Sequence, residues 1–196
     1  MRKCIQLFVL VVFLGPGSFI QAQTNNGLIV SFSVEGASST ELSSLKSGEK
    51  AVQFKQRIFF KTESKLKSVY KFDSLMFAPN ESLEIKNSLN RFKGVRKIND
   101  EEKILAKNYA YTFKIKCDIA FNESNVGVIL NEKTSRAVVY LAIGVFNQNG
   151  EQIAIYKGKS KDQNINIGEN QVNSQWLSMQ DFEYLFENAL LDLEKD

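Results

Sequence analysis

The clearest pattern in the chain is a long apolar segment followed by a turn, in residues 136–158. Residues 138–146 are apolar at nearly every position, so a strand formed by them would carry apolar side chains on both faces. Such a strand is covered on both sides, which places it at the centre of a sheet. Asn149-Gly150 is typical of a tight type I′ turn, because both residues tolerate a positive φ. The segment therefore predicts a hairpin with a buried first strand.

Residues 111–121 alternate apolar and polar side chains more regularly than any other segment. This period of two is typical of an antiparallel strand with one buried face and one solvated face. Residues 28–34 alternate in the same way and predict a first, half-buried strand. Residues 52–61 also alternate and predict a second strand, and a less regular pattern predicts a third at 66–77. The apolar patch at 126–130 predicts a short strand or a folded-back loop.

The end of the chain contains the best-defined helical pattern. Ser178 and Asp181 form a capping-box pattern, which marks the start of a helix. The apolar residues that follow recur at helical spacing, namely Met179, Phe182, Leu185, Phe186, Ala189, Leu190 and Leu193. Other helices are predicted at residues 39–48 and 79–94, the latter closed by a glycine, and, with a shorter pattern, at 100–107.

Together these elements predict one α+β domain over residues 23–196, with a largely antiparallel sheet and two longer helices packed against it. At 196 residues, the chain is long enough to form a substantial hydrophobic core. Its hydrophobic content of 43% and charged content of 24% are typical of a folded soluble protein.

Residues 1–22 match a secretory signal peptide, with Arg2 and Lys3 before an apolar run at 5–14. The run has about half of the roughly 20 residues that span a bilayer, so no permanent membrane span is expected. Cys4 precedes the run, whereas a lipidated cysteine would follow it. We expect cleavage after the last residue of this segment and an exported, soluble protein in the periplasm or outside the cell.

Charge is balanced overall but uneven along the chain. The formal net charge is +3, from 25 basic and 22 acidic residues, which gives no reason to expect nucleic acid as a partner. Residues 44–71 are basic, with Lys46, Lys50, Lys55, Arg57, Lys61, Lys65, Lys67 and Lys71. Residues 178–196 are acidic, with Asp181, Glu183, Glu187, Asp192, Glu194 and Asp196. The basic segment is either a face for an anionic lipid, a polysaccharide or an acidic partner, or an ordinary solvated surface.

The composition argues against most enzyme classes. The chain contains no histidine, the usual base of nucleophile pairs and a usual ligand of zinc and iron. Cys117 is either a nucleophilic or redox thiol or a small hydrophobe of the core, and its place on the apolar face of a strand favours the core. An enzyme that uses carboxylates such as Asp118 or Glu123 is a third hypothesis. We expect no enzymatic activity and no cofactor.

Two short patterns resemble ligand or modification sites. Asp162, Asn164 and Asn166 are spaced as at the start of an EF-hand loop, but the required glycine is replaced by Ile167. This departure favours a polar connection over a calcium site, and no metal ligands are predicted. The triplets that begin at Asn80 and Asn122 fit the N-glycosylation pattern, which is relevant only in a eukaryotic protein.

The C-terminal pattern Phe182-x-x-x-Phe186-x-x-Ala189-Leu190-x-x-Leu193 follows a predicted hairpin. This order of elements resembles bacterial envelope accessory domains, such as the auxiliary lipoproteins of lipid-transport ABC systems and the curli-secretion lipoprotein. The resemblance implies an accessory role in the cell envelope. The chain departs from these lipoproteins because it lacks their lipidation cysteine, and no site residue is transferred from them.

These observations lead to two hypotheses about function. The first is an exported, non-enzymatic accessory or binding protein of the cell envelope, which acts through its surface and sheet edge on another envelope protein or an anionic envelope component. The alternative is a carrier of a lipid or other apolar ligand in an internal cavity. That cavity would be lined by aromatic residues, namely Phe54, Phe60, Tyr111, Phe113 and Tyr140. A packed core favours the first hypothesis, and a cavity of several hundred Å³ favours the second.

Overall fold

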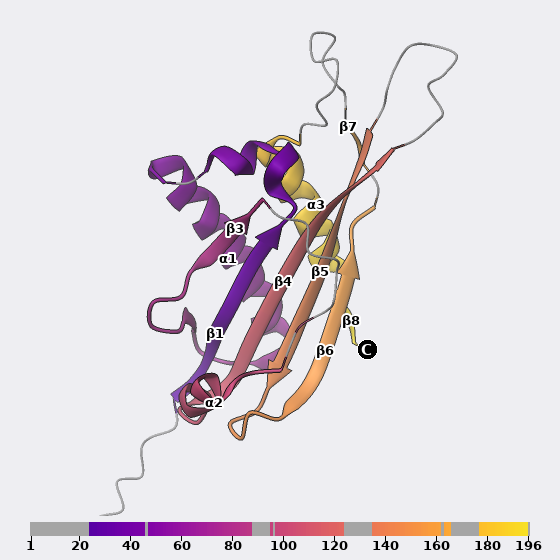
Figure 1. Ribbon diagram of the computed structural model, residues 1–196. Coiled ribbons are helices and arrows are strands. Elements are labelled where there is room, and N and C mark those ends of the chain that lie inside the picture. The colour runs from indigo at the N-terminus through magenta and orange to yellow at the C-terminus, as the bar shows by residue number, and fades with distance from the viewer. Residues whose placement is uncertain are drawn as a thin grey trace, which may run out of the picture.

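The computed structural model describes residues 24–45, 47–87, 95, 97–123, 135–161, 163–165 and 177–195 (Figure 1). The predicted leader and the apolar patch at 126–130 lie outside the described residues. Among the residues that the structure describes, no helix is long and apolar enough to cross a membrane.

The centre of the fold is a mixed sheet whose strands follow the order β2-β1-β4-β5-β6-β8, with β3 paired to β1 and β7 paired to β5. The strands are β1 (Thr24–Glu35), β2 (Leu75–Phe77), β3 (Leu83–Lys86), β4 (Tyr109–Glu123), β5 (Ser135–Phe146), β6 (Gln152–Lys159), β7 (Gln163–Ile165) and β8 (Glu194–Lys195). β1 runs parallel to β2, β3 and β4, whereas the pairs from β4 to β8 are antiparallel. The predicted α+β class is therefore confirmed, but the largely antiparallel sheet is wrong, because the β1 side of the sheet is parallel.

Helix α1 (Glu49–Tyr70) accounts for this difference, because parallel neighbours need a crossover connection. We predicted strands at 52–61 and 66–77, and the structure shows that this prediction is wrong apart from the last residues, which form β2. The buried residues of α1 are Ala51, Phe54, Ile58, Thr62 and Leu66, which lie on one helical stripe. The segment lacks glycine and proline and is rich in Lys, Glu and Gln, which favour helix.

The shorter helices were predicted with mixed success. Helix α2 (Asp100–Ala106) is confirmed, and its capping box joins Asn99 and Glu102. The helix predicted at 39–48 is replaced by two 3₁₀ turns, at Ala37–Ser39 and Glu41–Ser44. The helix predicted at 79–94 is wrong in its described part, which forms β3, and residues 88–94 lie outside the described residues.

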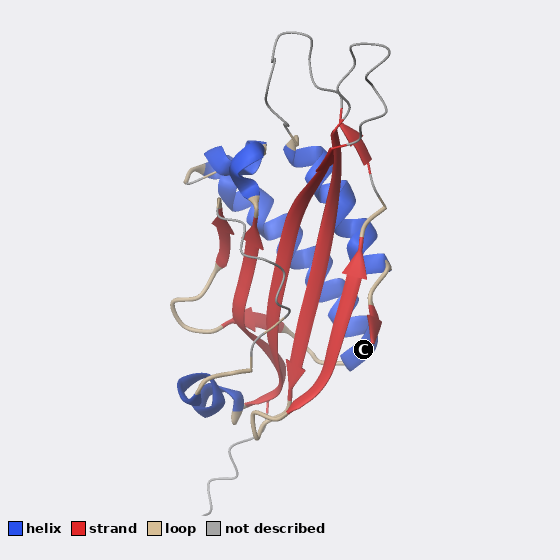
Figure 2. Ribbon diagram, turned by 45° about the vertical axis from the view of Figure 1, so that its right-hand side comes forward, coloured by secondary structure: helices blue, strands red, loops and turns tan. Residues whose placement is uncertain are grey.

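The two long helices, α1 and α3 (Met179–Leu191), cover the same face of the sheet (Figure 2). Ser178 caps α3 as predicted, since its hydroxyl accepts a hydrogen bond from the backbone N–H of Asp181. Phe186 stacks on Phe32 of β1, and Phe182 packs on Phe54 of α1. The core thus joins both helices to the sheet in one cluster.

The predicted hairpin is confirmed as β5 and β6, although its turn is of another type. Gly150 has a φ of 75°, but Asn149 does not have the positive φ that a type I′ turn requires. The side-chain oxygen of Asn147 instead accepts hydrogen bonds from the backbone N–H groups of Asn149 and Glu151. This longer turn ends in a glycine, as in hairpins with a bulge at the turn.

β5 is buried on both faces, as its apolar pattern predicted. Val139, Leu141, Ile143 and Val145 belong to the core under the helices. A second, smaller core on the opposite face contains Phe146 of β5 together with Leu28 and Val30 of β1 and residues on and around α2. The helical layer therefore occupies one face, and α2 covers one end of the other.

Candidate binding site at the β6 edge of the sheet

The outer edge of β6 carries an open cleft of about 300 Å³. Its walls come from β5, β6 and the C-terminal end of the chain, and they are formed by Tyr140, Leu141, Lys157, Gly158, Lys159, Asp192 and Glu194. Figure 1 shows β6 beside the short strand β8, which is the last described element. The cleft therefore lies where the end of the chain meets the edge of the sheet.

The C-terminal residues take the place of a neighbouring strand along part of β6. β8 pairs antiparallel with β6, with Glu194 opposite Lys157 and Lys195 opposite Tyr156. Two residues further along β6, the backbone N–H of Lys159 donates a hydrogen bond of 2.9 Å to Asp192 Oδ2. The outer edge of β6 is thus paired with the backbone of β8 at one place and hydrogen-bonded to the Asp192 side chain at another.

Asp192 occupies an electrostatically unfavourable place, because it caps the C-terminal end of α3. Its backbone N–H donates to the carbonyl oxygen of Asn188, and the last turn of the helix has no basic residue. A carboxylate near the negative end of a helix costs about 0.3–1 kcal/mol. The hydrogen bond from Lys159 offsets this cost and explains why the side chain turns towards the sheet edge.

Gly158 allows α3 to approach the strand closely. A Cβ added at this position would lie 2.1 Å from the carbonyl oxygen of Ala189, which is a backbone atom of the helix. Any other residue must therefore move either the strand or the helix. This contact fixes the end of α3, and hence Asp192, against the cleft.

The cleft has basic side chains on one side and acidic side chains on the other. Lys157 and Lys159 lie on β6, and Asp192 and Glu194 face them from the end of the chain. Lys159 Nζ also lies 5.6 Å from the centroid of the Tyr140 ring, within the range of a cation–π contact. This arrangement suits a polar or charged ligand in an extended conformation more than an apolar molecule.

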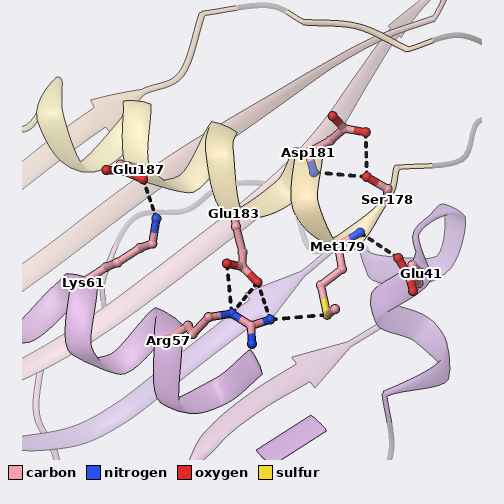
Figure 3. A network of polar contacts seen from close by, with 8 residues as sticks. All are labelled: Glu41, Arg57, Lys61, Ser178, Met179, Asp181, Glu183 and Glu187. Carbon is pink, nitrogen blue, oxygen red and sulfur yellow. Dashed lines mark hydrogen bonds and ion pairs between the residues drawn. The ribbon is translucent and has the colours of Figure 1, made fainter. Parts of the chain in front are cut away.

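The basic segment and the acidic helix, which we noted as separate features of the sequence, lie side by side (Figure 3). Arg57 Nη2 lies 2.7 Å from Glu183 Oε1, and Lys61 pairs with Glu187. The backbone N–H of Met179 donates to Glu41, which ties the start of α3 to the 3₁₀ turn. Part of the charge that could attract a partner is therefore used between α1 and α3, where exposed pairs of this kind contribute about 0.2–1 kcal/mol each.

The aromatic residues proposed to line a carrier cavity do not all come together, although Tyr111 and Phe113 pack with ring centroids 6.4 Å apart. Phe54 and Phe113 are fully buried and pack against other rings, Phe54 on Phe182 and Phe113 on Phe72. Phe60 is 61% exposed on α1. Tyr140, by contrast, lines the edge cleft, away from the core under the helices. Tyr111 packs against the edge of that core.

Cys117 is fully buried in the core, where burial and the neighbouring Asp118 raise the pKa of its thiol. Because the thiolate is the reactive form, we expect Ellman's reagent to label the native Cys4→Ser protein, in which Cys117 is the one remaining cysteine, to a negligible extent. Labelling should become complete once denaturant exposes β4. Fast labelling without denaturant would place this face of the strand in solvent and contradict the packing.

A group of charges that we did not predict lies on the opposite face of the sheet. Lys116 Nζ is 3.1 Å from Glu35 Oε2 and 3.5 Å from Asp118 Oδ1. Both carboxylates are almost completely buried, and neither contact has hydrogen-bond geometry. The pair Glu35 and Asp118 arises from the parallel register of β1 and β4, which a single sequence does not reveal.

This group predicts how stability depends on pH. Burial raises the pKa of Asp118, the Lys116 ammonium partly reverses the rise, and the Glu35 carboxylate adds to it. The folded state therefore binds this proton more tightly than the unfolded state, so Asp118 contributes most to stability at low pH and loses that contribution as pH rises through its raised pKa.

The amide of Asp118→Asn has no titrating proton and stays neutral as the pH changes. As pH rises above about 4, the ordinary pKa of an aspartate, towards the raised pKa of Asp118, the free energy of unfolding of the variant should therefore rise relative to that of the wild type. Urea unfolding of both proteins across this range checks the prediction. A difference that stays constant with pH, or changes in the other direction, would contradict it.

The remaining sequence patterns do not form a described site. Asn164 lies in β7, whereas Asp162, Asn166 and Ile167 lie outside the described residues. No group of three or more acidic or cysteine side chains that could hold a metal occurs within the described residues. Asn80 is exposed in a turn with a φ of 67°. The other triplet runs into residues that are not described.

No known protein family matches the chain, and neither does any curated protein. Among solved structures, the chain is similar to a Helicobacter pylori protein described as a homologue of neuraminyllactose-binding hemagglutinin. The TM-score is 0.42 and the sequence identity is 9%, over 87% of this chain and 81% of that chain. A similarity this distant carries no functional argument.

Proposed function

We propose that this chain is a non-enzymatic accessory or binding protein of the cell envelope, which engages its partner through the β6 edge of the sheet. The partner class is another envelope protein or an anionic envelope component. Export is part of the proposal and rests on the leader pattern of residues 1–22.

The observation that carries the proposal is the contrast between the packed interior and the open edge. Rings from α1, α3 and β1 fill the space between the helices and the sheet, with centroid distances of 5.8–6.3 Å. The cleft at the β6 edge, in contrast, presents lysines, carboxylates and strand backbone to solvent. This distribution supports recognition at the surface over the carriage of an apolar molecule in the interior.

A capture experiment with a charge reversal in the cleft tests the proposal. The tagged full-length protein is used to capture partners from envelope extracts, in the wild-type form, as Lys159→Glu and as Lys50→Glu. Lys50 is the matched control, because it is an exposed lysine on α1, outside the cleft. The expected result is a loss of about tenfold or more in captured partner for Lys159→Glu alone.

Native mass spectrometry of the same preparations tests the alternative. We expect the purified protein to carry no apolar small molecule. An apolar molecule bound in equal amount to the protein, or capture that Lys159→Glu leaves unchanged, would contradict the proposal.

A further inference from the structure

We propose that the outer edge of β6 is a docking site for an extended peptide strand of a partner protein, and that β8 occupies part of this site in the structure. The inferred peptide runs antiparallel to β6, with an acidic residue opposite Lys157 and an apolar residue opposite Ile155. This inference rests on the proposed function and specifies the chemistry of the partner.

The backbone of β6 supports strand addition. The N–H of Lys159 points away from β5, since it donates to Asp192. Residues at even spacing from Lys159 present their backbone groups to the same side as far as the register shift of β6 next to Ala154, so Lys157 and Ile155 share this outer edge. Within the described residues, the outer side of β6 pairs with a strand only at Tyr156 and Lys157, through β8. The edge therefore continues beyond the short strand that covers it.

The side chains along this edge define which strand fits. Lys157 is exposed, and in the structure it lies opposite Glu194, an acidic residue. Towards the start of β6 the next residue on this edge is Ile155, whose side chain is half-buried. Cross-strand pairs are most favourable between opposite charges and between apolar β-branched residues. A strand with Glu or Asp opposite Lys157 and Val or Ile opposite Ile155 is the complement of this edge.

The strand β8, which occupies part of the site, is weakly attached to β6. β8 has two residues, and both are exposed. Leu193, which precedes it, lies near Gly158 and packs against the core, so the helix stays docked when β8 leaves. Short, exposed elements open at little cost in free energy. A longer partner strand would gain more backbone pairs than β8 provides.

The test measures the binding of a fluorescent peptide, Glu-Thr-Val-Thr-Val-Thr, to the full-length protein. The variant Glu194→Pro removes a backbone N–H from β8, and Glu194→Ala is its matched control because it keeps that group. We expect Glu194→Pro to bind the peptide about tenfold more tightly than the wild type, since β8 no longer competes. A peptide with methylated backbone nitrogens should lose binding, because strand pairing needs these donors.

The charge preference provides an independent readout. Lys157→Glu should weaken binding of the acidic peptide and favour a peptide in which Lys replaces Glu. Equal binding of the methylated peptide, or no gain from Glu194→Pro, would overturn the inference. Dimerisation of Glu194→Pro in analytical ultracentrifugation would also overturn it, because the edge would then take a second copy. If partner capture depends on Lys159 while no peptide binds, the proposed function stands and the strand inference fails.

Discussion

Replacing Phe186 with alanine is expected to lower the free energy of unfolding by about 3–5 kcal/mol. The ring is fully buried and stacks on both Phe32 of β1 and Phe182 of α3, with centroid distances of 6.3 and 5.9 Å. Its removal would leave a cavity between the helix and the sheet that neither layer can fill without moving. A domain of ordinary stability has about 5–15 kcal/mol in total, so this single change would threaten folding.

Urea unfolding followed by circular dichroism measures this effect. Tyr184→Ala is the matched control, because Tyr184 is an aromatic residue of the same helix that is 60% exposed. The control should change the free energy of unfolding by about 0.5 kcal/mol or less. Similar effects of the two substitutions would mean that α3 is not docked on the sheet as described.

The second large effect is expected for Gly158→Ala, which should lower the free energy of unfolding by about 3 kcal/mol. The added Cβ would lie 2.1 Å from the Ala189 carbonyl oxygen, a backbone atom that no side-chain rotation can move. The end of α3 must then move away from β6, together with Asp192 and the cleft.

Gly27→Ala is the matched control for this prediction. Gly27 is also buried in a strand, but its nearest neighbours are side-chain atoms of Leu75 and Phe113, at 2.9 Å. These side chains can shift, so a smaller loss of stability is expected. Equal losses in the two variants, measured by urea unfolding, would show that the close approach of helix and strand does not determine the effect.

The elements predicted correctly are those whose apolar pattern fits either a strand or a helix but not both. β4 alternates strictly, and α3 carries an apolar stripe that a strand could not bury. β5 is apolar on both faces, so its central position follows from burial alone. These elements form the β4–β5–β6 side of the sheet and one of its two long helices.

The sequence failed where one spacing fits two structures. Phe54 and Ile58 are four residues apart, which places them on one face of either a strand or a helix. The buried stripe of α1 continues through Thr62, a polar residue whose hydroxyl donates to the carbonyl oxygen of Ile58. Because the exposed residues Val52 and Phe60 complete an alternating pattern with Phe54 and Ile58, residues 52–61 were predicted as a strand, and the parallel pairing of β1 was missed with it.

For the candidate site, the sequence predicted only that the protein acts through its surface and a sheet edge, without naming the residues. Its lysines, Lys157 and Lys159, stand at alternate positions at the end of a predicted hairpin, and its carboxylates belong to an acidic run at the end of the chain. The sequence contains both groups but not their antiparallel register. That register depends on how α3 docks at Gly158, which is a property of the packed fold.

Photo-crosslinking from the sheet edge tests the central claim most directly. A photoreactive amino acid is introduced into the full-length protein either at Lys157 on β6 or at Tyr184 on the exposed side of α3, and each protein is irradiated in envelope extracts. We expect a discrete partner to crosslink from position 157 and not from position 184. Crosslinks from position 184 alone, or equal crosslinking from both positions, would contradict a function that acts through the β6 edge.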